Sequence, residues 1–348
     1  MKHFMIASLL TIIGLVVFIL IDSETIFPQE KMTVDEEQQG LKDQITIIFS
    51  HVVAENTPKG LAAQKFAELV YEKTDGRVKV EVYPNGILYS DHNELDALKR
   101  GKIQMIAPSY TNMTELVPEW KVLDLPFLFH DYDHAKAVFT GETGKELLQY
   151  LDSSKLKGLA FWSNGFKQMT SSVHPLLEPA DFKNQTFRVM SGDVLKKQFQ
   201  LLGATPVTAS FTDVYSSLEK HQFDGQENTL SNIYSKGLYK FQPYLTLSNH
   251  GFLGYSVIIN NEFWSRIPSD IQQQITEAML ETTLWNMDES KKMNEIQLEE
   301  MKKQADVSIY ELPIEAKRRW IEKFKPLYEE LEKQMPDNLI NRIRKTSS

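Results

Sequence analysis

The sequence predicts an α/β fold built from two successive β-α-β series. Apolar runs rich in β-forming residues alternate with amphipathic helical segments along most of the chain, which is the pattern of a sheet covered by helices. A β-rich run at Tyr255–Asn260 is long enough to pass between the two halves. A helical pattern from Ser269 to about Gln304 lacks sustained heptads, so a helix that braces both halves is favoured over a coiled-coil arm or two shorter helices.

The first series lies between residues 44 and 107. Its predicted strands are Gln44–Phe49, Val78–Tyr83 and Ile103–Ala107, and its predicted helices are Leu61–Lys73 and Asp91–Arg100, with Asp91 as the cap of the second. In such sheets ligands bind beyond the carboxyl ends of the strands. His51 and Ser109 follow two of these ends, and we therefore expect both near a binding site.

The segment after the first series contains two histidines. His130 and His134 are four residues apart among carboxylates and could form half of a metal site. Asp131 can instead cap a helix that runs through Phe139. Because no third ligand with suitable spacing is visible, we expect no metal and no cofactor.

A strand is predicted at Leu159–Trp162, and Asn164–Lys167 is predicted to turn away from its end. The second series lies after Asn164. Its predicted strands are Thr186–Met190 and Ala204–Thr208, and the segment Phe223–Asn228 ends it. A helix capped by Asp193 and ended by Gly203 lies between the two strands, and a helix capped by Thr212 follows the second. After the long helix a strand is predicted at Val307–Leu312. Pro313 then begins a last helix with Trp320, Phe324 and Leu327 facing inward.

Arg188 lies in the middle of the predicted strand Thr186–Met190. A guanidinium keeps its proton at ordinary pH, and burying it without an anionic partner costs several kcal/mol. Asp193 or Glu227 could form an internal salt bridge with it, or a ligand carboxylate could accept a two-pronged hydrogen bond. Taken by itself, Arg188 favours the internal pair.

Length and composition narrow the class of protein. A chain of 348 residues can hold one large domain or two of ordinary size. The formal charge of −9 argues against a nucleic-acid-binding protein, which needs a basic face. The absence of cysteine excludes disulfides, thiolate metal sites, a cysteine nucleophile and a lipid-modified N-terminal cysteine.

Residues 4–21 form an uncharged apolar run that Lys2 precedes and Asp22 follows. The run is short for a membrane span and long for the core of a signal peptide, and no small-residue cleavage site follows it. We therefore predict a membrane anchor over residues 1–21, with a cleaved signal as the alternative, and a flexible acidic tether over 22–43. The rest of the protein is expected on the extracytoplasmic face of the cell membrane.

The chemistry in the sequence is that of binding. No nucleophile elbow, phosphate loop, dinucleotide fingerprint or zinc-protease motif is present, so an extracellular hydrolase remains possible only by default. Strand ends gather two cations, two amides and two aromatic residues, a set that suits a small organic anion: Lys167, Arg188, Asn228, Gln226, Phe211 and Trp162. Taken singly, Lys167 also fits a solvated turn, Phe211 a core position, and the amides hydrogen bonds within a turn.

Blocks of sequence spread over residues 44–335 carry a family resemblance. They include Ser50–His51, Thr57–Gly60, Tyr83–Asn85, Leu125–Phe129, Phe187–Met190, Leu202–Pro206, Phe211–Tyr215, Asp224–Asn228, Ile233–Tyr234 and Leu245–His250. In content and spacing these blocks resemble the solute-binding proteins of TRAP transporters. The similarity is greatest to the DctP type, which binds C4-dicarboxylates such as succinate, fumarate and malate.

The resemblance implies a two-lobed, periplasmic-binding-protein-like fold with hinge strands and a long helix spanning both lobes. Lobe I is expected at 44–164 and 254–293, and lobe II at 165–253 and 294–340. Arg188 is implied to bind a ligand carboxylate, and Asn228 to donate a hydrogen bond to the same carboxylate. Phe211 is implied to form a wall of the pocket, and Glu227 to have a supporting role. Lys167 is at the position where the family has a second arginine. The planar guanidinium, which can form two parallel hydrogen bonds, is thus replaced by a compact ammonium group. Ser109 and His51 are implied from the opposite lobe.

The function implied is capture of a dicarboxylate by lobe closure and its delivery to a TRAP-type membrane permease. One alternative is a tethered co-sensor of dicarboxylate for a membrane transporter or kinase. A less favoured one is the extracellular hydrolase. We expect no enzymatic activity and no nucleic-acid partner.

Overall fold

The computed structural model describes residues 44–304, 306–336 and 338–347. The predicted anchor over 1–21 and the predicted tether over 22–43 lie outside the described residues. Within the described ranges, no helix combines the length and the apolar character needed to cross a membrane.

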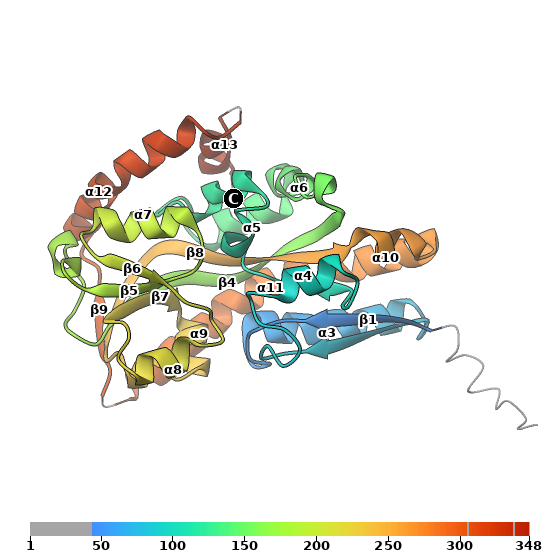
Figure 1. Cartoon of the computed structure of the whole chain (residues 1–348), viewed down its shortest axis with the longest axis horizontal. Coiled ribbons are helices and arrows are strands. Elements are labelled where there is room, and N and C mark those ends of the chain that lie inside the picture. The colour runs from blue at the N-terminus through green and yellow to red at the C-terminus, as the bar shows by residue number, and fades with distance from the viewer. Residues whose placement is uncertain (1–43, 305, 337, 348) are drawn as a thin grey trace, which may run out of the picture. The chain divides into compact units, whose positions relative to one another are not determined.

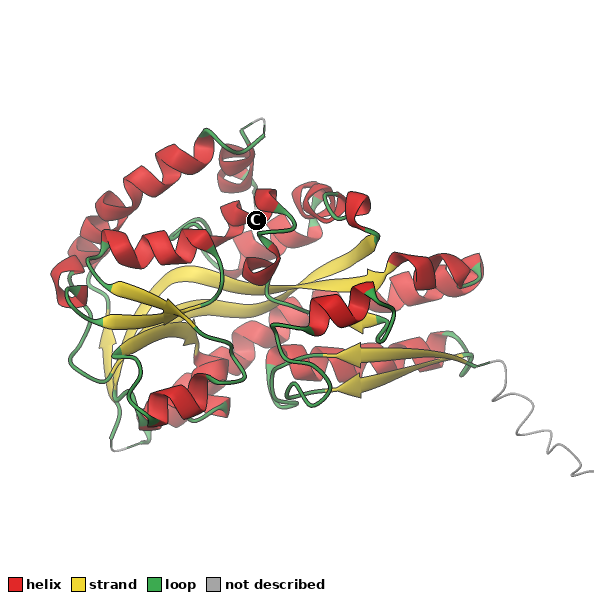
Figure 2. Cartoon of the chain, viewed as in Figure 1, coloured by secondary structure: helices red, strands yellow, loops and turns green. Residues whose placement is uncertain are grey.

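The described part of the chain forms one mixed sheet of nine strands covered by helices (Figures 1 and 2), which confirms the predicted α/β class. The sheet has the strand order β2-β1-β3-β8-β4-β7-β5-β6, and β9 (Ser308–Glu311) pairs with β8. One end is parallel and holds β1 (Ile45–Ser50), β2 (Val78–Tyr83) and β3 (Met105–Ile106). The other end is also parallel and holds β5 (Thr186–Val189), β6 (Thr205–Thr208) and β7 (Gly225–Thr229). These are the two predicted series.

Two long antiparallel strands, β4 (Leu156–Ser171) and β8 (Tyr244–Asn260), join the two ends of the sheet. The predicted turn at Asn164–Lys167 is therefore wrong, because this segment lies inside β4. The pairing register with β8 shifts between Ser163 and Gly165, and Gly165 has a φ of 109°. An Asn-Gly pair has the composition of a turn, but here it marks β-bulges that bend a continuous strand.

The helices cover both faces of the sheet (Figure 2). The α-helices are α3 (Pro58–Lys73), α4 (Glu94–Lys99), α5 (Tyr132–Thr140), α6 (Glu142–Gln149), α7 (Asp193–Leu201), α8 (Val214–Glu219), α9 (Leu230–Ser235), α10 (Asn261–Arg266), α11 (Ser269–Lys302), α12 (Ile314–Glu332) and α13 (Leu339–Lys345). Short 3₁₀ helices occupy Tyr110–Met113, Pro118–Asp124, Asp152–Ser154, Pro179–Phe182 and Leu238–Lys240. The last helix, α13, has no counterpart in the prediction.

The long helix α11 confirms the predicted brace, because it packs against α3 of the first series and against α9, which follows the second. Its polar side chains bind the bend in β4. The Asn286 side chain accepts a hydrogen bond from the backbone N–H of Ser163 at 2.6 Å. Asn294 donates to the carbonyl of Asn164 at 2.8 Å. Residues Ile45–Ser348 form one compact unit, and the lobe boundaries stay a prediction.

Of the predicted helix N-caps, one is confirmed and three differ in the structure. Asp131 caps α5 as expected, since its Oδ1 accepts from the N–H of His134 at 2.8 Å. Asp91 is not a cap: α4 begins three residues later, and Asp91 Oδ2 accepts from the N–H of Phe211 in the other series at 2.9 Å. The expected caps Asp193 and Thr212 are each displaced by one residue, because the N-cap positions are Gly192 and Asp213. A short polar side chain near a helix start is a local signal, and it carries no information about a partner far along the chain.

The core follows the predicted apolar faces. Trp320 and Phe324 of α12 are fully buried, and Leu327 is nearly so, as predicted. Trp162, which the sequence places near the binding residues, is also fully buried, and its indole N–H donates to the hydroxyl of Thr283 at 3.1 Å. Trp162 is therefore part of the core.

Candidate functional site

A pocket lies among residues of both β-α-β series. Its lining includes five of the predicted site residues, namely Arg188, Lys167, Asn228, Phe211 and Ser109. These residues come from β5, β4, β7 and two loops, so residues far apart in sequence meet at one place. The sixth, His51, does not line it.

Arg188 is a buried cation that lines this pocket. It is 2% exposed, and β5 positions it between β6 and β7. Its Nε donates to the carbonyl of Ala209 at 2.9 Å. In the part of the chain that the structure describes, no carboxylate lies within salt-bridge distance of its guanidinium. Burial lowers the pKa of Arg188 to about 10, opposed by Asp91 and Glu227, so the side chain stays charged at neutral pH.

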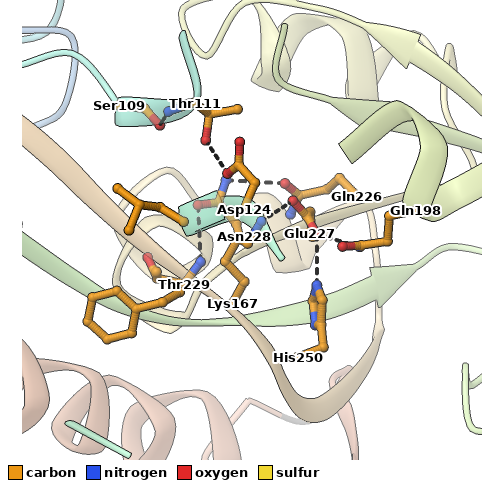
Figure 3. Close-up of polar contacts among 12 residues, drawn as sticks. Ser109, Thr111, Asp124, Lys167, Gln198, Gln226, Glu227, Asn228, Thr229 and His250 are labelled. Carbon is orange, nitrogen blue, oxygen red and sulfur yellow. Dashed lines mark hydrogen bonds and ion pairs between the residues drawn. The ribbon is translucent and has the colours of Figure 1, made fainter. Parts of the chain in front are cut away.

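Lys167 lies on β4 and is 1% exposed, so it is not a solvated turn residue. Its Nζ is 2.5 Å from Oε1 of Glu227 on the neighbouring strand β7 (Figure 3). The internal ion pair considered for Arg188 is thus made by Lys167. The stem of Lys167 passes over Gly251, where an added Cβ would lie 2.5 Å from its Cε.

Glu227 is the centre of a buried polar network, as Figure 3 shows. Its Oε2 accepts from Nε2 of His250 at 2.7 Å and from Gln198 at 3.1 Å. Burial raises the pKa of Glu227, but Lys167 and the hydrogen bond from His250 outweigh this effect and leave the pKa well below its usual value. Burial lowers the pKa of His250 and so keeps its ring neutral, and Nδ1 can then accept from the Ser248 hydroxyl at 2.7 Å.

The amides beside the cations are held in fixed orientations. Asn228 Oδ1 accepts from Nδ2 of Asn232 at 2.8 Å and from the N–H of Thr229 at 3.1 Å. Asn228 Nδ2 donates to Oε1 of Gln226 at 3.2 Å, and Gln226 donates in turn to Thr170 at 3.1 Å. Gln226 does not line the pocket. This chain of bonds orders Asn228 and Asn232 at the pocket wall.

Phe211 and Ser109 complete the predicted set. The Phe211 ring lies 4.4 Å from the ammonium of Lys236, and that ammonium also donates to the Phe211 carbonyl at 2.7 Å. Burial and the neighbouring Arg188 lower the pKa of Lys236 to about 8. Ser109 Oγ accepts from the N–H of Thr111 at 3.2 Å, which fixes the turn where the pocket meets the first series.

His51 lies behind the pocket wall. It is fully buried and packs edge-on against Phe49 with ring centroids 6.1 Å apart, while the next residues, Val52 and Val53, line the pocket. Neither ring nitrogen has a hydrogen-bond partner among the described residues. Burial and the charge of Lys59 lower the pKa of His51 to about 3, so the ring is neutral at pH 7.

Several pocket residues were not predicted. Asp91, Glu94, Asn232 and Tyr255 all line the pocket. The sequence contains a signal for Glu94, because the helical repeat places it on the same face as the buried Ala97 and Leu98. A charged residue on an apolar helix face indicates either a buried pair or a ligand contact.

The two histidines considered as half of a metal site have other contacts. The rings of His130 and His134 stack with centroids 4.5 Å apart, and Nε2 of His134 lies 2.8 Å from the carbonyl of Ile343. Across the described ranges, no group of three histidine, cysteine, aspartate or glutamate side chains is placed to hold a metal ion.

Comparison with known proteins agrees with this architecture. Residues 49–334 match the model of bacterial extracellular solute-binding protein family 7, DctP. A C4-dicarboxylate-binding protein, DctB, from Bacillus subtilis is 46% identical over 343 residues, covering 99% of this chain and 98% of the relative.

Solved structures are similar as well. A TRAP periplasmic solute-binding protein from Sulfurospirillum deleyianum with bound succinate has a TM-score of 0.84 and 39% identity, covering 87% of this chain and 99% of that one. A corresponding protein from Pseudomonas aeruginosa with bound L-malate has a TM-score of 0.80 and 35% identity, covering 82% and 99%. The chain therefore belongs to family 7 of the bacterial extracellular solute-binding proteins, the DctP family.

Proposed function

We propose that the protein captures a C4-dicarboxylate outside the cytoplasm and delivers it to a TRAP-type membrane permease. The observation that carries this proposal is Arg188, a buried guanidinium that faces the pocket and has no salt bridge among the described residues. A buried cation of this kind is stabilised when an anion occupies the pocket, and a carboxylate matches the guanidinium fork with two parallel hydrogen bonds. The relatives named for dicarboxylate binding, and the structures with succinate and L-malate, support the same ligand class.

A ligand as small as a C4-dicarboxylate can bind with micromolar affinity. A C4-dicarboxylate has about eight heavy atoms, so the ligand-efficiency ceiling of about 1.5 kcal/mol per atom allows about 12 kcal/mol. Micromolar binding needs about 8 kcal/mol. Arg188 provides the ligand's charge partner, because the charge of Lys167 is already balanced by Glu227. Asn228 and Asn232 add neutral hydrogen-bonding groups at the same wall.

Closure of two lobes is the proposed way in which binding is signalled to the membrane partner. Two contacts join the expected lobes beside the pocket. Asp91 Oδ2 accepts from the N–H of Phe211 at 2.9 Å, and the Ser191 hydroxyl lies 3.0 Å from Oδ1 of Asn112. A ligand that contacts both sides adds its own bonds to these and favours the closed form.

The proposed location is the outer face of the cell membrane, with residues 1–21 as the anchor. The apolar run over 4–21 supports this, since it is flanked by a positive N-terminus and an acidic segment. Membrane fractionation of tagged full-length protein tests it. Recovery in the membrane fraction after a high-salt wash supports an anchor, and recovery in the medium supports cleavage.

The binding proposal is tested by calorimetry with succinate. We expect Arg188→Ala to lose detectable binding with the fold intact, because removing a buried unpaired cation does not break a salt bridge. Arg188→Lys should weaken binding strongly, since an ammonium lacks the fork. The matched control is Arg319→Ala, which removes an exposed arginine paired with Glu178 and should leave affinity unchanged. An unchanged affinity in Arg188→Ala would overturn the proposal.

Two further measurements address the alternatives. Genes for a permease pair beside this gene support delivery, whereas a histidine kinase without permease genes supports the co-sensor. Turnover of a dicarboxylate ester by the purified protein, lost on replacement of a pocket carboxylate, would show a hydrolase instead of a binding protein.

A further inference from the structure

Glu94 is a buried carboxyl group that lines the pocket without a hydrogen-bond partner. It is the first residue of α4 and is 1% exposed. Neither Oε1 nor Oε2 contacts a donor in the described chain. Burying an unpaired carboxylate is so costly that such a group binds a proton or meets a partner from outside the chain. Glu94 therefore differs from Glu227, whose two oxygens are both bonded.

The charged and titratable groups around Glu94 come from three elements. Lys59 lies on α3, Asp91 precedes α4, and Tyr255 lies on β8. Lys59 is fully buried, its Nζ donates to the carbonyl of Ala107 at 2.8 Å, and it lies 3.7 Å from the centre of the Tyr255 ring.

Lys59 has no carboxylate within salt-bridge distance in the described part of the molecule. Burial raises the pKa of Glu94 to about 8, with Lys59 opposing and Asp91 reinforcing the rise. At neutral pH Glu94 is thus mainly a neutral hydrogen-bond donor beside a buried ammonium. This arrangement accepts a carboxylate, although an ionised Glu94 would repel one.

Glu94 and Arg188 lie on different parts of the fold. Arg188 belongs to β5 of the second series, and α4 packs against β3 and β8 on the side of the first. The charged groups that act on Arg188 are Asp91 and Glu227, whereas those that act on Glu94 are Lys59 and Asp91. Arg188 and Glu94 thus reach the same pocket from the two different series.

We propose that Glu94 is a specificity-determining residue that donates a hydrogen bond, as a neutral carboxyl group, to the ligand carboxylate remote from Arg188. This inference rests on the proposed function and deepens it, because it explains how the pocket distinguishes a dicarboxylate from a monocarboxylate of the same length. Arg188 binds the carboxylate that both ligands share. Glu94 contacts only the second carboxylate.

The test compares succinate with butyrate, which lacks the second carboxylate, in wild type, Glu94→Gln and Glu94→Leu. Glu94→Gln keeps a donor and should bind succinate within about threefold of wild type. Glu94→Leu should weaken succinate by about tenfold or more, as expected for the loss of a hydrogen bond to a charged group, and should leave butyrate within about threefold. The preference for succinate therefore shrinks.

The matched control is Asp96→Leu, which changes an exposed acidic residue of the same helix that pairs with Arg100. It should leave the preference unchanged. The role of Glu94 would be overturned if Glu94→Leu also leaves the preference unchanged, or if it weakens the affinities for succinate and butyrate equally. Either result would leave the proposed function standing. A wild-type protein that binds no dicarboxylate would instead overturn the proposed function.

Discussion

The ammonium group of Lys167 lies 2.5 Å from Oε1 of Glu227, and both side chains are almost completely buried. Glu227 is thereby bound on both oxygens, by Lys167 on one and by His250 and Gln198 on the other. The pair joins β4, which crosses the whole sheet, to β7 of the second series. It leaves Arg188 as the cation of the pocket lining without a salt bridge among the described residues.

Breaking this pair should destabilise the protein. Glu227→Gln leaves the Lys167 ammonium buried without an anion, and we expect the free energy of unfolding to fall by about 3 to 5 kcal/mol. Urea denaturation measures the change. The matched control is Glu178→Gln, which breaks the exposed pair with Arg319 and should cost no more than about 1 kcal/mol. Equal losses in the two variants would contradict the assignment.

Replacing both partners should cost less than replacing one. The double variant Lys167→Met with Glu227→Gln removes the uncompensated charge, so its unfolding free energy should exceed that of Glu227→Gln alone. The same urea experiment measures this. A double variant less stable than Glu227→Gln would show that the Lys167 side chain stabilises the fold through other contacts.

Local patterns in the sequence predicted the elements whose own residues carry a clear helical or strand repeat. The strand Val78–Tyr83 agrees with β2 at both ends, and the long helix agrees with α11 to within two residues. Arg188 was placed correctly on a short buried strand, since its apolar neighbours form a clear β-run.

The errors concern contacts between distant segments. The turn predicted at Asn164–Lys167 is a bulged strand, because pairing with both β7 and β8 decides its conformation and no local residue reveals those partners. Lys167 finds Glu227 sixty positions away in the chain for the same reason. Asp91 likewise has a helix-capping composition and a partner in the other series.

Ligand affinity should depend on pH. Burial brings the pKa values of Lys59, Glu94 and Lys236 to about 8, downward for the lysines and upward for the glutamate. A bound dicarboxylate stabilises each ammonium and disfavours an ionised Glu94, so it raises all three pKa values, and binding takes up protons near pH 8. Succinate itself is fully ionised above pH 7. Its affinity should therefore fall by about tenfold or more between pH 7 and 9.

Calorimetry in two buffers of different ionisation enthalpy gives the number of protons taken up with succinate. The expected sign is uptake at pH 8, decreasing toward pH 7, where the three groups already carry most of their protons. Proton release at pH 8, or an affinity that is constant from pH 7 to 9, would contradict this linkage.

Gly165 should tolerate no side chain. Its φ is 109°, and an added Cβ would lie 2.6 Å from the hydroxyl of Tyr132 and 2.7 Å from Nδ2 of Asn294. Gly165→Ala should therefore cost about 3 kcal/mol or more of unfolding free energy. Gly101→Ala is the matched control, because Gly101 also has a positive φ but no atom lies within 4 Å of an added Cβ, so only about 1 kcal/mol should be lost. Equal thermal shifts in the two variants would show that crowding at the bulge contributes nothing.

Ser191 provides a test of closure that leaves the pocket charges unchanged. Its hydroxyl lies 3.0 Å from Oδ1 of Asn112, which joins the end of β5 to the 3₁₀ helix Tyr110–Met113 that follows the first series. Ser191→Ala should weaken the closed form by about 1 kcal/mol, which corresponds to a roughly fivefold faster release of succinate in stopped-flow chase experiments. Ser216→Ala, which removes an exposed hydroxyl bonded within its own helix end, is the control and should leave the release rate unchanged. An unchanged rate in Ser191→Ala would mean that this contact persists whether or not ligand is bound, and lobe closure would then have to occur about a different boundary.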